Sequence, residues 1–123
     1  MIRGIVNANA EAIVRLRLRG PGGVESDVDA MVDSGFTAYL TLPETVVSAL
    51  GLVRENGGSA ILGDGAASQF DVCTAEVDWG GTWRAVLVYV LGNEPLLGMR
   101  SMAGQKLVID VVAGGLVEIL PLP

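Results

Sequence analysis

Apolar and polar residues alternate along two neighbouring segments near the start of the chain. Residues Ala12 to Arg19 read Ala-Ile-Val-Arg-Leu-Arg-Leu-Arg, and residues Glu25 to Ala30 alternate in the same way. The stretch Gly20-Pro21-Gly22-Gly23 between them is typical of a turn. Because a period of two indicates strands, these segments predict an antiparallel hairpin folded about Gly22.

This hairpin has a strongly specified register. A turn centred on Gly22 sets opposite charges directly across from each other in three pairs: Arg19 with Glu25, Arg17 with Asp27, and Arg15 with Asp29. The other face pairs Leu16 with Val28 and Val14 with Ala30. Each charge pair contributes roughly 0.2–1 kcal/mol, and a one-residue slip would set charges against apolar residues. A charge ladder is favoured over a phosphate site, since the carboxylates neutralise the arginines, and over a calcium loop, whose third acidic position and glycine are missing.

The rest of the chain predicts more strands and one or two short helices. The expected elements are a short helix over Pro43–Gly51, a long hairpin over Ser59–Val77, a turn at Trp79–Thr82, a strand over Val86–Val90, a helical turn at Met99–Met102 and a last hairpin over Leu107–Leu120. No linker is visible. We therefore expect an all-β fold in one domain over residues 1–123.

Composition fits this fold and excludes several partners. Half of the residues are hydrophobic, few are aromatic, and 17 are glycines, as expected for one aliphatic core with many turns. The net charge of −6 argues against nucleic acid. The longest apolar run, Ala85–Leu91, is too short to cross a bilayer, and the N-terminus has no apolar signal segment. We expect a cytoplasmic protein without a membrane partner, in which the single Cys73 is a buried thiol.

The chain contains no histidine, which limits the chemistry open to it. Ser-His-Asp and Cys-His sites are excluded within one chain, as are histidine-based zinc sites. A Ser-Lys dyad remains open because Lys106 is present, but no motif indicates one. Acid–base catalysis would come mainly from carboxylates, with tyrosine or a bound metal as weaker options.

One motif carries candidate chemistry. Asp33-Ser34-Gly35 lies between two apolar segments, and the wider stretch Met31 to Pro43 resembles the active-site loop of retropepsin-like aspartic proteases, in particular of small prokaryotic members. A second stretch, Glu94 to Met99, resembles the hydrophobic-hydrophobic-Gly element of the same fold. The resemblance runs in order from about Met1 to Ile119.

The resemblance implies a closed β-barrel lobe with a flap hairpin and a set of site residues. Asp33 would be catalytic, and Ser34 and Gly35 would support it in the active-site loop. Leu96, Leu97 and Gly98 would lie beside that loop, and Asp64, Gly65 and Ala66 would form the flap over the substrate. No cofactor or metal is implied. The aromatic residues are expected mainly to pack, with a few open to a role in the cleft: Phe36, Tyr39, Phe70, Trp79, Trp83 and Tyr89.

Only one Asp-Ser/Thr-Gly motif is present, so the resemblance implies a homodimer with one Asp33 from each chain. The expected function is an aspartic endopeptidase acting on peptides or proteins. Two alternatives remain: a non-catalytic dimerisation or peptide-binding module with the same fold, and a plain β-barrel in which the motif is a coincidence. The termini Met1-Ile2 and Ile119–Pro123 are candidates for part of the dimer contact, although the last hairpin departs from the shortest retroviral pattern.

Overall fold

The computed structural model describes residues 1–61 and 67–123. Over these described residues the chain is mostly strand, as predicted, with one short α-helix and one 3-10 turn. The elements follow in this order: β1 (Ile2–Val6), β2 (Ala12–Arg19), β3 (Glu25–Asp33), β4 (Leu40–Leu42), α1 (Glu44–Ala49), β5 (Glu55–Ile61), β6 (Ala67–Trp79), β7 (Thr82–Val90), β8 (Leu96–Gly98), η1 (Met99–Met102), β9 (Gln105–Ile109) and β10 (Leu116–Pro121).

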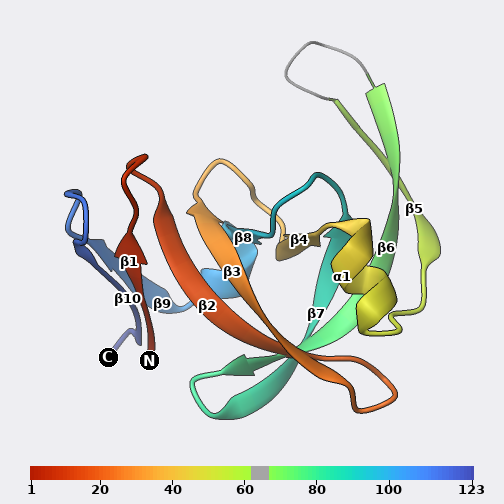
Figure 1. Cartoon of the computed structure of the whole chain (residues 1–123), viewed down its shortest axis with the longest axis horizontal. Coiled ribbons are helices and arrows are strands. Elements are labelled where there is room, and N and C mark those ends of the chain that lie inside the picture. Colours follow the sequence, from red (N-terminus) through yellow and green to blue (C-terminus); the bar gives the residue numbers. More distant parts are fainter. Residues whose placement is uncertain (62–66) are drawn as a thin grey trace.

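Six of the strands close into a barrel. The strands are hydrogen-bonded in the order β5-β6-β7-β4-β8-β3-β2-β1-β10-β9, and a further pairing of β6 with β2 closes the ring from β6 round to β2. The closing contact is short, with Leu18 opposite Val77 and Arg19 opposite Glu76. Strands β1, β10 and β9 extend the sheet to one side of the barrel, and β5 pairs with β6 on the other side (Figure 1).

The barrel interior is filled by the apolar face of each alternating strand. In β2, Val14, Leu16 and Leu18 are at most 1% exposed, whereas Arg15 and Arg17 between them face outward. Val28 and Ala30 of β3 are buried opposite Leu16 and Val14, in the register predicted. Cys73 is buried in this core as a free thiol, which confirms its expected role as a small hydrophobe.

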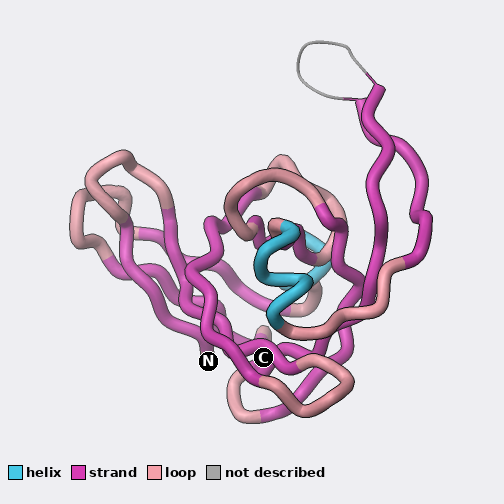
Figure 2. The backbone as a smooth tube through the Cα atoms, turned by 45° about the vertical axis from the view of Figure 1, so that its right-hand side comes forward, coloured by secondary structure: helices cyan, strands magenta, loops and turns pink. Residues whose placement is uncertain are grey.

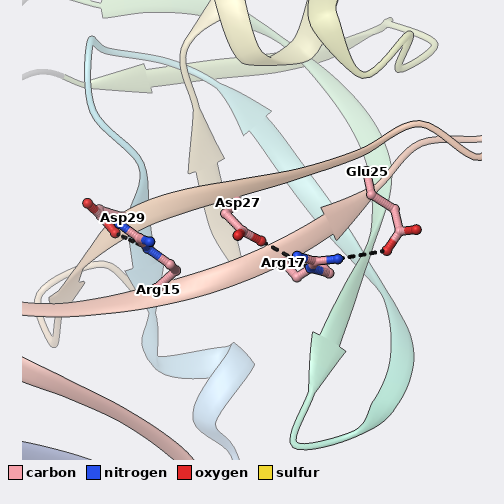
Figure 3. A network of polar contacts seen from close by, with 5 residues as sticks. All are labelled: Arg15, Arg17, Glu25, Asp27 and Asp29. Carbon is pink, nitrogen blue, oxygen red and sulfur yellow. Dashed lines mark hydrogen bonds and ion pairs between the residues drawn. The ribbon is translucent and has the colours of Figure 1, made fainter.

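The predicted charge ladder on the outer face of β2 and β3 is confirmed, with one difference. Arg15 Nε lies 3.1 Å from Asp29 Oδ1, and Arg17 lies between Asp27 and Glu25, at 3.1 Å and 3.7 Å (Figure 3). Arg19 stands opposite Glu25 in register, but its guanidinium turns to Glu76 of β6, with two hydrogen bonds of 3.0 and 3.1 Å. The barrel closure supplies this partner, which a local hairpin pattern does not reveal.

The long hairpin is formed by β5 and β6, which pair antiparallel from Glu55 opposite Val72 to Ile61 opposite Ala67. Its described strands extend away from the barrel in both views (Figures 1 and 2). The expected flap residues Asp64, Gly65 and Ala66 lie outside the described residues. The next turn has positive φ at both Gly80 and Gly81, the geometry that a two-residue hairpin loop favours.

The two termini lie in one sheet of the same chain. Ile2 of β1 is opposite Ile119 of β10, and β10 pairs with β9 in the predicted last hairpin. Ile2 and Ile119 are both buried within the chain, whereas Met1 and Leu122 are exposed. Of the terminal residues considered for a dimer contact, Met1 and Leu122 are therefore accessible to a second chain.

The predicted short helix is present as α1, which begins directly after Pro43 and is followed by Gly51 at a φ of 65°. Val47, a residue of this helix, is fully buried. Neither helix in the described part of the chain is long and apolar enough to cross a membrane.

Candidate active site

Asp33 is the last residue of β3, where the strand turns sharply into the loop that leads to β4. The Gly35 N–H donates to Asp33 Oδ1 at 2.9 Å, and the Phe36 N–H donates to the Asp33 carbonyl oxygen at 3.1 Å. An aspartate that accepts from the backbone two residues on is a common turn former. The carboxylate is half-buried, so it is oriented by the loop and still reaches the surface.

Strand β8 lies between the two strands that the loop joins. It runs parallel to β3, with Asp33 opposite Gly98, and antiparallel to β4, with Leu40 opposite Leu97. The stretch Leu96-Leu97-Gly98 therefore lies beside the Asp33 loop. Sequence periodicity alone does not reveal this pairing, because the two strands are far apart in the chain.

Backbone hydrogen bonds hold the loop after Asp33 to the end of β8 and the start of η1. The N–H of Gly98 donates to the Tyr39 carbonyl at 2.9 Å, and the N–H of Met99 donates to the Phe36 carbonyl at 2.8 Å. The two donors, Gly98 and Met99, are adjacent in the chain, and their acceptors, Tyr39 and Phe36, lie near the two ends of the loop. The loop is thus fixed by the core of the barrel and not only by its own turn.

Gly98 is required at this junction for a steric reason. A Cβ at this position would overlap the carbonyl oxygen of Ala38 and lie 2.7 Å from Phe36 Cδ2. Carbon atoms do not approach a backbone oxygen so closely, and the backbone cannot give way without moving the loop. Gly35 is less confined, since a Cβ there would lie 3.2 Å from Asp33 Oδ1.

Ser34 and Gly35 are exposed at the tip of the loop. Within the described part of the chain, the Ser34 hydroxyl has no hydrogen-bond partner. The role of this hydroxyl in joining two copies of the loop stays a prediction. Its exposed position leaves it accessible to a second copy.

Two buried hydroxyls that the sequence analysis missed support this region. Thr41 Oγ1 accepts from the Leu96 N–H at 3.0 Å and lies 3.5 Å from the Glu94 carbonyl, to which it donates. Ser101 Oγ donates to the Tyr39 carbonyl at 2.6 Å. Both side chains are at most 3% exposed, so they tie β8 and η1 to β4 in the interior. A threonine between the apolar residues Leu40 and Leu42 is the sequence signal that could have revealed the first of them.

Aromatic rings connect the loop to the long hairpin. The centroid of the Phe36 ring is 5.9 Å from that of Tyr89 in an edge-to-face contact, and the centroid of the Phe70 ring is 4.6 Å from that of Tyr89. Trp79 and Trp83 instead lie against the guanidiniums of Arg84 and Arg19. Of the aromatic residues considered for the cleft, those nearest the Asp33 loop are therefore Phe36, Tyr39 and Tyr89.

Tyr39 and Tyr89 line a small cavity of about 150 Å³ together with Thr37 and Arg100. Among the described residues, no three Cys, Asp or Glu side chains lie close enough to hold a metal ion. The chemistry available at the loop is that of one oriented carboxylate. A single carboxylate accepts or donates a proton, but it does not do both in the same step.

Comparison with known proteins shows the fold. No family model and no curated protein matches the sequence. Among solved structures, the chain is similar to a retropepsin-like aspartic protease from Rickettsia conorii, with a TM-score of 0.62 and 17% identity over 97% of this chain and 88% of that one. The chain therefore has a retropepsin-like fold, as the sequence predicted. The low identity supports the fold and not the activity.

Proposed function

We propose that this chain is one half of a homodimeric aspartic endopeptidase. The observation that carries the proposal is the position of Asp33. Its carboxylate accepts from the Gly35 N–H at 2.9 Å, and its backbone pairs with Gly98 across a junction that admits no side chain. An arrangement that orients one carboxylate at a half-exposed loop of a retropepsin-like barrel favours this function over a plain structural barrel.

In the proposed mechanism, a two-fold axis brings two copies of the loop together. Two carboxylates held close together share one proton, because two neighbouring negative charges repel and the second carboxyl group ionises with difficulty. The ionised Asp33 takes a proton from a water molecule, whose oxygen attacks the carbonyl carbon of the scissile bond. The protonated Asp33 of the other copy donates its proton to the carbonyl oxygen. The first Asp33 then passes the proton that it took from water to the nitrogen, and the second Asp33 regains a proton from a hydroxyl of the intermediate. Collapse of the intermediate breaks the carbon–nitrogen bond, releases the amine and a carboxylic acid, and leaves the two carboxylates sharing one proton again.

The exposed Ser34 hydroxyl supports this assembly. At the tip of the loop it is accessible to the backbone of a second loop across a two-fold axis, and its chain offers it no other partner among the described residues. The exposed terminal residues Met1 and Leu122 are candidates for the outer part of the contact. We propose the cytoplasm as the location, since a single free cysteine suits a reducing compartment.

A cleavage assay on a denatured protein pool tests the function. Wild type is expected to produce new peptide termini, with greater activity at acid pH because the dyad needs one proton. Asp33→Asn is expected to abolish this activity while leaving the circular dichroism spectrum unchanged. Asp110→Asn is the matched control, because it removes an exposed carboxylate from the β9–β10 turn. Equal cleavage by wild type and Asp33→Asn would contradict the mechanism. Peptide binding without cleavage would instead favour the non-catalytic module.

A further inference from the structure

A groove lies on the outer face of β1, β2 and β3. It has a volume of about 620 Å³ and is bounded on one side by Glu94 and Pro95, which lead into β8. An apolar row forms part of its lining, with Met31 opposite Ile13 and Ile13 opposite Ile5 across three adjacent strands. No step of the proposed mechanism uses this groove.

The groove lies on the same face of β3 as Asp33. Successive side chains of a strand alternate between faces, so Asp29, Met31 and Asp33 share one face, and the first two of these line the groove. Since a strand rises about 3.3 Å per residue, the groove begins about 7 Å from Asp33 and reaches about 13 Å from it. An extended peptide that runs along β3 from Asp33 would bring the side chain of its second to fourth residue from the scissile bond into the groove.

The charges that line the groove are not balanced. Its two arginines already have carboxylate partners: Arg15 lies 3.1 Å from Asp29 (Figure 3), and Arg3 lies 3.8 Å from Glu118. Glu11 accepts from the neutral Asn7 amide at 2.9 Å, and the Glu94 carboxylate has no partner among the described residues. Two carboxylates of the groove therefore lack a cation.

We propose that this groove binds a lysine or arginine side chain of an extended peptide substrate. The aliphatic stem of such a side chain would lie on Ile5, Ile13 and Met31, and its cation would lie near Glu11 and Glu94. Lysine and arginine cover apolar surface in this way while the charged end stays in water. This inference rests on the proposed function, because it takes the peptide path across Asp33 as given. In a two-fold dimer the same groove is present on both sides of the scissile bond.

The test uses one peptide that wild type cleaves, remade with Lys, Gln or Glu at the second to fourth residue on each side of the bond. Binding to Asp33→Asn is measured by fluorescence anisotropy, and kcat/KM is measured for wild type. At one or more positions, the Lys peptide is expected to bind about two- to fivefold more tightly than the Gln peptide, as for exposed ion pairs, and the Glu peptide more weakly. Glu94→Lys is expected to reverse this order, and Asp110→Asn to preserve it.

The outcomes separate this inference from the proposed function. If the peptides are cleaved and Asp33→Asn abolishes cleavage, but Lys, Gln and Glu peptides behave alike, the groove inference is wrong and the function stands. If Asp33→Asn cleaves the peptide as fast as wild type while kcat/KM still favours the Lys peptide, the proposed mechanism is wrong and the groove inference stands. A change of mass in light scattering for Glu94→Lys, without a change in peptide preference, would show a second copy in the groove and overturn the inference.

Discussion

Asp33 lies directly opposite Gly98 in the parallel pair of β3 and β8. This relationship joins the candidate catalytic carboxylate to a position where the neighbouring carbonyl of Ala38 leaves no space for a side chain. The geometry of the loop and the stability of the barrel therefore depend on the same contact.

Gly98→Ala is expected to destabilise the protein by about 3 kcal/mol, because the added methyl group forces the Asp33 loop away from β8. Urea denaturation followed by circular dichroism measures the change. Gly22→Ala is the matched control, since nothing lies within 4 Å of a Cβ at that position and its φ is negative or extended. Equal stability of the two variants would show that the close contact at Gly98 is relieved easily.

Thr41→Val is expected to cost about 1–3 kcal/mol, because it replaces the buried Thr41 hydroxyl and leaves the half-buried Leu96 N–H without its acceptor. The shape of the side chain is nearly preserved, so the loss reports the hydrogen bond. Thr74→Val, at an exposed position of β6, is expected to change the stability by less than about 0.5 kcal/mol. Thermal unfolding of the two variants side by side measures the difference, and a neutral Thr41→Val would mean that Leu96 finds another acceptor.

The hydrogen bonds from Arg19 lower the pKa of Glu76 from its ordinary value of 4.5. A lowered pKa in the folded state adds stability above the ordinary carboxyl pKa, and this stability is lost as the pH falls through the folded value. Glu76→Gln is therefore expected to be less stable than wild type at neutral pH and equally stable in strong acid. The difference is expected to be small and to shrink with added salt, since the pair is partly exposed. Denaturation at several pH values checks this, and a pH-independent difference would contradict it.

Burial raises the pKa of the Cys73 thiol above its ordinary value of 9.0. The neutral thiol is therefore favoured by folding, and the stability it contributes is present below pH 9 and lost as the pH rises through the folded value. Labelling of the native protein by a thiol reagent at neutral pH is expected to be at least about a hundredfold slower than in denaturant, because it requires local opening. Rapid native labelling would mean that β6 opens easily at this residue.

Local pattern alone is enough to predict the β2–β3 hairpin. A period of two and a glycine turn determine the register of Arg17 opposite Asp27 without reference to the rest of the chain. Arg19 marks the limit of such reasoning, because its partner Glu76 follows 57 residues later and is brought close only by barrel closure.

The same limit applies at the candidate site. The Asp33 motif stands out in the sequence, but the position of Leu96-Leu97-Gly98 beside it was expected only from the resemblance to a family, and the parallel register of Asp33 with Gly98 comes from the structure. The acceptor role of Thr41 depends on β8 passing beside β4, so it follows only from the three-dimensional arrangement. The structure gives the position of Asp33, and its catalytic role stays a prediction.

Subunit mixing tests most directly the central proposal that two copies of Asp33 form one site. Wild type is held at a fixed concentration, under conditions where light scattering shows a dimer, and about a ninefold excess of Asp33→Asn is added. If the site is shared and subunits exchange freely, only about a tenth of the wild-type chains keep a wild-type partner, and peptide cleavage falls to about a tenth of its starting rate. Cleavage that stays at its starting rate, although the chains are shown to exchange, would contradict a shared site.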